Sequence, residues 1–135
     1  MPRVTTTIQN HIAHVELTRS DKMNAVDPAM LAAIIEAGEA LRGNTDVRAV
    51  VLSGQGNAFC AGLDVASFAA FAGGDPHEIM MPRTHGQSND YQHVSMIWHQ
   101  LEMPVIAALQ GVCFGAGLQI ASGADMRIAA PDTRM

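Results

Sequence analysis

The alternation of apolar and polar positions along the chain predicts short strands and helices in a regular order. Two runs rich in β-branched residues flank Asn10 and His11, a pair that favours a hairpin turn. Asp27 is a suitable helix N-cap and Pro28 fits the first helical position, and apolar residues then recur at helical spacing. The pattern predicts strands at residues 3–9, 12–18, 47–54, 105–109 and 126–130 and helices at residues 28–42, 64–72, 91–103 and 115–123.

One long stretch interrupts this order. Residues 73–90 carry glycine, proline and polar residues without a strand or helix period, so we expect a mobile loop there. Loops of this length are usually functional or disordered. After the first two strands, helices and single strands follow one another, with two helices in succession at residues 64–72 and 91–103, and this order is typical of an α/β fold.

Composition constrains the surface of the protein. A chain of 135 residues is the size of one domain, and such a chain buries roughly 68–70% of its unfolded surface on folding. Apolar residues make up 48% of the chain and charged residues 16%, against about 25% charged in an average protein. We therefore expect part of the surface to be covered, either in an oligomer or by a part of the protein outside this sequence.

Several classes of function do not fit the sequence. The net charge of −5, with one Trp and one Tyr, provides neither a basic stripe nor a stacking surface for nucleic acid. The most apolar window, residues 104–121, is interrupted by Pro104, Gln110 and three glycines, so no membrane span is expected. Two cysteines, Cys60 and Cys113, cannot form a disulfide framework, and a reducing cytoplasm is the expected compartment.

The residues with chemical potential follow two predicted strands. AGLD at 61–64 and GAGL at 115–118 each stand where a buried strand enters a glycine-containing loop and then a helix. Helix N-termini leave N–H groups unsatisfied, and two such ends facing each other would stabilise a carbonyl oxygen that becomes an oxyanion. On spacing alone, helix caps and tight packing explain these glycines as well. The spacing does not match a dinucleotide or phosphate-binding loop.

Three separated stretches resemble one enzyme family. RSDKMNAV, VRAVVLSGQGNAFCAGLDV and MPVIAALQGVCFGAGLQIASGADMRIA are similar, in order and separation, to the crotonase family of enoyl-CoA hydratases and isomerases. The resemblance implies an α/β crotonase-like spiral of ββα units, usually assembled as homotrimers or hexamers, that binds acyl-CoA thioesters and needs no cofactor besides the coenzyme A of its substrate. Relatives are about twice as long, so we expect residues 1–135 to be the N-terminal part of a longer domain.

The resemblance also assigns roles to individual residues. It makes the backbone N–H groups of Leu63 and Ala116 the two oxyanion donors. It places the remaining substrate-binding residues at the coenzyme A entrance (Lys22, Met23 and Ala25), near the adenine and pantetheine (Ala61, Asp64 and Val65) and in the two glycine loops (Gly62 and Gly115). Relatives often carry a phosphate-binding lysine where this chain has Ala66, so phosphate contact would depend on Lys22, Arg19 or residues outside the sequence.

The sequence departs from the hydratase pattern at Gln119. Similar hydratases have a glutamate there and dienoyl-CoA isomerases an aspartate, whereas an amide cannot transfer a proton near neutral pH. Enolate chemistry is therefore expected, with isomerisation favoured over hydration. A non-catalytic acyl-CoA binding or scaffold protein, or a crotonase-fold hydrolase or decarboxylase, stays open as an alternative, and so does Gln119 as a merely satisfied helix residue.

Metal and cysteine chemistry are weaker possibilities. His93 and His99 are six residues apart, off the spacing of a helical metal site, so no metal is expected. Cys60 and Cys113 each precede a glycine loop and can lie close together, but neither has an evident base beside it in sequence.

Overall fold

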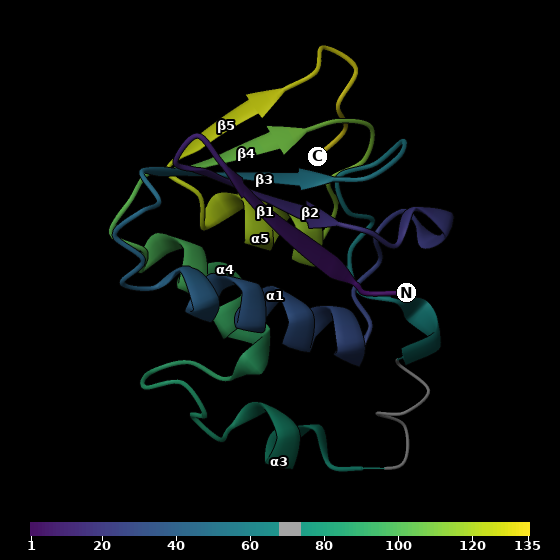
Figure 1. Ribbon diagram of the computed structural model, residues 1–135. Coiled ribbons are helices and arrows are strands. Elements are labelled where there is room, and N and C mark those ends of the chain that lie inside the picture. The colour runs from purple at the N-terminus through teal and green to yellow at the C-terminus, as the bar shows by residue number, and fades with distance from the viewer. Residues whose placement is uncertain (68–73) are drawn as a thin grey trace.

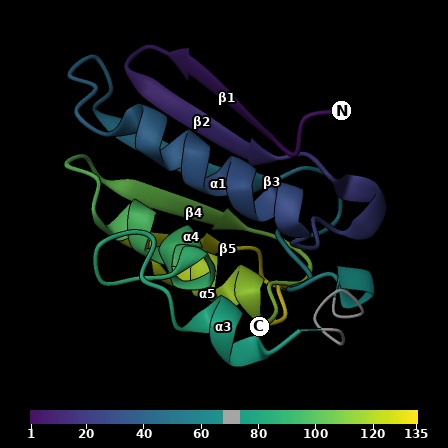
Figure 2. The same ribbon diagram turned by 90° about the horizontal axis from the view of Figure 1, so that it is seen from below.

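Five strands form one sheet, and the helices lie on one of its faces (Figure 1). The computed structural model describes residues 1–67 and 74–135. Figure 2, viewed from the helical side, shows α1 running along the strands, with α4 and α5 beside it. The elements are β1 (Val4–Gln9), β2 (Ile12–Leu17), η1 (Ser20–Lys22), α1 (Pro28–Leu41), β3 (Ala49–Gly54), α3 (Pro76–Met80), α4 (Asp90–His99), β4 (Val105–Leu109), α5 (Ala116–Ser122) and β5 (Met126–Ala129).

The strands lie in the sheet in the order in which they occur in the chain. β1 and β2 are antiparallel, and the turn between them has Asn10 and His11 in the left-handed region (φ 51° and 65°), as the hairpin prediction requires. β2, β3, β4 and β5 are mutually parallel. The C-terminal ends of β3 and β4 therefore meet at one edge of the sheet, and the loops that follow them start as neighbours.

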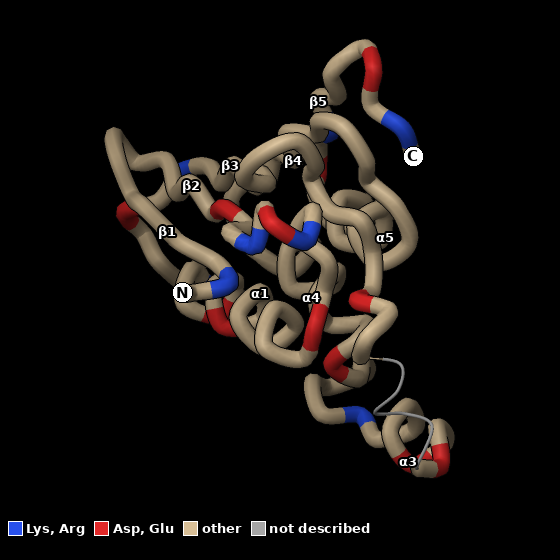
Figure 3. The backbone as a smooth tube through the Cα atoms, turned by 90° about the vertical axis from the view of Figure 1, so that its right-hand side faces the viewer, with Lys and Arg blue, Asp and Glu red and all other residues tan. Residues whose placement is uncertain are grey.

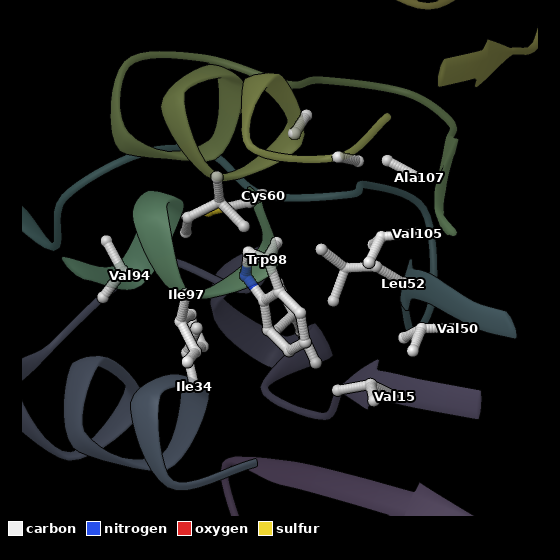
Figure 4. Packing of buried hydrophobic residues seen from close by; sticks show 14 of the residues in the cluster. Val15, Ile34, Val50, Leu52, Cys60, Val94, Ile97, Trp98, Val105 and Ala107 are labelled. Carbon is white, nitrogen blue, oxygen red and sulfur yellow. The ribbon is translucent and has the colours of Figure 1, made fainter. Parts of the chain in front are cut away.

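The core lies between the sheet and the helices. Alternate strand residues such as Val15, Leu52 and Ala107 are fully buried. They face the apolar side of α1, represented by Ile34, and the indole of Trp98 on α4 (Figure 4). The alternation of buried and partly exposed strand positions follows the two-residue period of a pleated strand, which leaves the opposite face of the sheet only partly covered.

Gly38 lets α1 and α4 approach each other closely. A β-carbon at this position would overlap the Ile97 side chain of α4, which is fully buried. The helical spacing of apolar residues therefore predicts α1 correctly, and the small residue within it sets how near the second helix lies.

The predicted strands and helices are present, with two differences at helices. The helix predicted over residues 91–103 ends at His99, because the residue before Pro104 is disfavoured in helical conformation and the chain must turn into β4. The helix predicted over 64–72 starts as expected at residues 65–67, and its residues 68–72 lie outside the described part of the chain. Among the described residues, no helix combines the length and apolarity needed to cross a bilayer.

The stretch predicted to be a loop at residues 73–90 contains α3. The carboxylate of Asp75 accepts a hydrogen bond from the N–H of His77 at 2.9 Å, and Pro76 occupies the first helical turn. This is the same Asp-Pro start as at Asp27, but no apolar period follows it, so the hydrophobic pattern alone predicts a loop here.

Candidate functional site

The glycine-containing loops that follow β3 and β4 lie side by side. The backbones of Cys60 and Cys113 pair in an isolated parallel β-bridge, and both cysteines are free thiols. The N–H of Cys60 donates to the carbonyl of Val112 at 3.1 Å, and the N–H of Phe114 donates to the carbonyl of Cys60 at 3.0 Å. The two cysteines are thus close together because they extend two neighbouring parallel strands by a few residues.

The two loops touch through glycines. Gly62 has a φ of +100°, and a β-carbon on it would lie 3.1 Å from the carbonyl oxygen of Phe114 and 3.8 Å from the nitrogen of Ala116. Gly115 has a φ of +49°, and its β-carbon would lie 3.9 Å from the α-carbon of Gly62. The backbone preceding Leu63 and the backbone preceding Ala116 therefore pack directly on each other, with no side chain between them.

The backbone hydrogen bonds around Leu63 and Ala116 use the groups on either side of their N–H groups. Leu63 forms a parallel bridge with Val26, in which the carbonyl of Gly62 and the N–H of Asp64 bond to Val26 (2.8 and 2.9 Å). In such a bridge the central residue points its own N–H to the opposite side. Ala116 is the first residue of α5, where an N–H has no partner within the helix.

A cavity of about 530 Å³, here called the donor cavity, lies over this contact. Gln119, one turn after Ala116 on α5, lines the same cavity and is exposed. The structure thus brings together six of the residues predicted for the site. The cavity is lined by Val26, Leu31, Ala61, Gly62, Leu63, Met80, Tyr91, Val94, Phe114, Gly115, Ala116 and Gln119.

The second explanation of the glycines, tight packing, holds at two other positions. A β-carbon on Gly117 would lie 2.7 Å from the β-carbon of Cys60, and one on Gly111 would overlap the carbonyl oxygen of Asn57. These two glycines let α5 and the loop after β4 lie against the loop after β3. Site geometry and packing are therefore served by different glycines of the same motif.

Asn24 holds the predicted coenzyme A entrance against the loop after β3. It is fully buried, and its amide nitrogen donates to the carbonyls of Gln55 and Ala58 at 3.0 and 2.8 Å. Its Oδ1 accepts from the N–H of Arg19 at 2.9 Å. Asn24 was not singled out from the sequence, although Asn is among the side chains that best tolerate its left-handed φ of 54°.

Asp64 is bound within an ion-pair cluster. Its Oδ2 lies 2.6 Å from Nη1 of Arg19, which also lies 3.4 Å from Oδ2 of Asp27, and Asp27 in turn pairs with Arg3 at 2.6 Å. Figure 3 shows basic and acidic positions side by side near the N-terminus, where this cluster lies. The guanidinium of Arg19 is already paired with the carboxylates of Asp64 and Asp27. Of the two cations considered for phosphate contact, the exposed Lys22 is therefore the better candidate.

Both carboxylates of the cluster are held in their charged form. The hydrogen bond from Arg19, followed by that from the N–H of Ala66, lowers the pKa of Asp64. Burial raises the pKa of Asp27, but the N–H of Met30 and the neighbouring arginines outweigh it and the net pKa is lowered. Neither group is suited to carry a proton in the neutral range.

The other residues predicted for coenzyme A lie outside the donor cavity. Met23 and Val65 are 53% and 79% exposed, and the carbonyls of Met23 and Ala25 accept hydrogen bonds from the N–H of Ala61 and the guanidinium of Arg19. These residues form the outer rim of the loop, whereas the donor cavity lies on the α5 side. Their role in binding coenzyme A stays a prediction.

The two cysteines behave as buried apolar residues. Both are fully buried, and burial raises the pKa of Cys60 to about 11 and also raises the pKa of Cys113. A thiol with such a pKa supplies little thiolate at neutral pH.

A larger cavity of about 1110 Å³, here called the α4–α5 cavity, adjoins the donor cavity. In its wall the buried His93 contacts Glu39 of α1 through Nε2 at 2.9 Å and Ser88 through Nδ1 at 3.1 Å, and it stacks on His85 with ring centroids 4.1 Å apart. The hydrogen bond from His93 lowers the pKa of Glu39. The sequence offers His93 only as a possible metal ligand, because its partner Glu39 on α1 is distant in the chain.

Within the described ranges, no three His, Cys, Asp or Glu side chains are arranged to hold a metal ion.

Known proteins resemble this chain in sequence over most of its length. The family model described as enoyl-CoA hydratase/isomerase matches residues 7–135. A Mycobacterium tuberculosis protein named "Probable enoyl-CoA hydratase EchA14" is 39% identical over 92% of this chain and 45% of its own length. The mouse mitochondrial Delta(3,5)-Delta(2,4)-dienoyl-CoA isomerase is 31% identical, over 94% and 40%.

Solved structures show the same fold. The crystal structure of an enoyl-CoA hydratase from Shewanella pealeana matches with a TM-score of 0.85 and 25% identity, covering 97% of this chain and 48% of that one. The chain thus spans about half the length of the relatives it matches. The predicted crotonase-like α/β fold is confirmed, and the chain belongs to the enoyl-CoA hydratase/isomerase family.

Proposed function

We propose that the protein acts on acyl-CoA thioesters and that the N–H groups of Leu63 and Ala116 hold the thioester oxygen as it gains negative charge. The observation that supports the proposal is the direct packing of Gly62 and Gly115 beside a cavity that both Leu63 and Ala116 line. Membership of the enoyl-CoA hydratase/isomerase family supports a thioester as the ligand.

The proposed chemistry requires no other charged group at the oxygen. When a proton leaves or joins the α-carbon of a thioester, or a nucleophile attacks the β-carbon, the carbonyl oxygen becomes an enolate oxygen. Two preorganised N–H donors stabilise that charge, and each is worth about 2.7–4 kcal/mol of barrier in comparable sites. The same pair would serve isomerisation, hydration and α-proton exchange alike.

Gln119 determines which of these reactions we favour. Its side chain shares the donor cavity with Leu63 and Ala116, where an amide can orient a substrate or a water but cannot move a proton. Hydration needs one group to activate water and another to protonate the α-carbon, whereas a double-bond shift can proceed with one shuttling acid. We therefore favour isomerisation, or another enolate reaction, over hydration, and we assign the shuttling of the proton to an acid outside residues 1–135, as the family resemblance implies.

Coenzyme A would be bound as part of the substrate, without a further cofactor. Lys22 on the exposed η1 is the cation we assign to its phosphates, and Met23, Ala25 and Val65 to its rim contacts. A homotrimer or hexamer in the cytoplasm is the assembly we propose, in line with the low charge content of the chain.

Exchange of α-protons tests the proposal without presupposing a particular reaction. Butyryl-CoA in D₂O should lose its α-proton NMR signals in the presence of the protein, and calorimetry should detect acetoacetyl-CoA but only weak binding of free acetoacetate. Binding without exchange would favour the alternative suggested by Gln119, a non-catalytic acyl-CoA binding protein. No binding of either thioester would refute the proposed function.

A further inference from the structure

Tyr91 stands where the cavities of the protein meet. Tyr91 and Gln119 are the two described residues that line both the donor cavity and the α4–α5 cavity. Tyr91 also lines a cavity of about 470 Å³ between α1 and α3 and a small one of about 20 Å³ beside Leu63. A single residue is therefore part of the wall of all four of these spaces.

The start of α4 fixes where this ring lies. Asn89 and Gln92 form a capping box, in which each side chain bonds to the backbone N–H of the other, and Tyr91 is the second residue of the helix. Ser95 follows one turn later, and its hydroxyl donates to the carbonyl of Gln119 at 2.6 Å. Residues four apart share one face of a helix, so Tyr91 lies on the face that meets α5.

The two cavities also differ in size and lining. The donor cavity, about 530 Å³, has apolar side chains such as Val94 and Phe114 around the backbone donors. The α4–α5 cavity, about 1110 Å³, adds polar groups such as Gln92 and Ser122. Because Tyr91 lines both cavities, removal of its ring would enlarge the space available where the two meet.

We propose that Tyr91 is a specificity-determining residue whose ring limits the acyl group to what fits the donor cavity. This inference rests on the proposed function, because it takes the donor cavity as the site of the acyl group next to the thioester. With the ring in place, thioesters with a short acyl group have the higher kcat/KM. Without it, a long acyl chain extends past Gln119 into the α4–α5 cavity.

The test compares a short and a long substrate in matched variants. For wild type, Tyr91→Ala, Tyr91→Phe and the control His99→Ala, kcat/KM for α-proton exchange in D₂O is measured with butyryl-CoA as the short substrate and with dodecanoyl-CoA as the long one. His99 is exposed on the same helix and lines none of these cavities. Tyr91→Ala should raise the ratio of the long to the short substrate by about tenfold or more, mainly through a lower KM for the long one. Tyr91→Phe should leave the ratio within about twofold, since it keeps the ring, and His99→Ala should change neither value.

The outcomes separate this inference from the proposed function. A wild-type protein that neither binds nor exchanges an acyl-CoA refutes the proposed function and this inference together. If the wild-type protein reacts and Tyr91→Ala lowers kcat/KM for both substrates by the same factor, the role of Tyr91 in specificity is refuted while the proposed function stands. Tyr91 is then a structural residue. If Tyr91→Ala does not fold, Tyr91→Leu removes the ring while keeping an apolar side chain, and an unchanged ratio in that variant overturns the inference.

Discussion

Gly62→Ala should disable the proposed donors while leaving every side chain of the site in place. The new β-carbon would lie 3.1 Å from the carbonyl oxygen of Phe114, at a φ of +100° that an L-residue rarely adopts. Both effects shift the peptide that carries the N–H of Leu63. Misalignment of one such donor costs about 2.7–4 kcal/mol of transition-state stabilisation, so kcat/KM should fall by about 10² to 10³.

Gly43→Ala is the matched control for backbone strain. Gly43 also has a positive φ, +69°, but a β-carbon there would meet nothing within 4 Å. Strain of about 1–2 kcal/mol is expected in this variant, without any contact to the site. The assay measures kcat/KM for α-proton exchange of butyryl-CoA, and thermal unfolding is recorded for both variants. The donor argument is refuted if Gly62→Ala keeps its rate within about threefold, or if Gly43→Ala loses rate to the same extent.

Three other predictions concern the missing acid at Gln119, the packing of the core and the ion-pair cluster. Gln119→Glu should raise crotonyl-CoA hydration by up to about 10² to 10⁴, measured by loss of enoyl absorbance, and a wild-type turnover of about 10 s⁻¹ or more would contradict the reasoning. Gly38→Ala should lower the free energy of unfolding in urea by about 1–3 kcal/mol, because overpacking against α4 exceeds the gain in helix propensity; an unchanged midpoint would show that α4 can move away. The pKa values of Asp27 and Asp64 are lowered below the ordinary 3.8 in the folded state, so the stability these carboxylates contribute is complete above that pH and is lost as pH falls through the lowered values. Arg19→Gln should bring the pKa of Asp64 back toward 3.8 in an NMR titration, whereas an unchanged pKa would exclude Arg19 as its cause.

Local signals in the sequence predict most of the fold. The hairpin at Asn10 and the Asp27–Pro28 helix start are encoded within a few residues, and both are present in the structure. The same Asp-Pro signal at residue 75 begins α3, which a period-based prediction misses because a five-residue helix is too short to show a period. The predicted end of α4 is too late, because the apolar period continues towards Pro104 whereas the helical backbone ends at His99.

The candidate site was predictable only in part, for a physical reason. Leu63, Ala116 and Gln119 belong to recognisable motifs at strand exits, and adjacent parallel strands bring such exits together. The partners of Asn24 and the contact between His93 and Glu39 join segments far apart in the chain, so no local pattern records them. Burial of Asn24 and occupation of Arg19 by carboxylates likewise become visible only in the folded arrangement.

The bridge between Cys60 and Cys113 has a consequence for the entropy of binding. It ties the two loops at the spacing of neighbouring parallel strands, about 4.8 Å, before any ligand arrives. A donor on a long side chain would lose up to about 2 kcal/mol of rotamer freedom on being fixed by a substrate. A peptide N–H in a loop that this bridge holds in place has little such freedom left to lose. Its ordering is completed when the chain folds, and the free energy of binding need not supply it again.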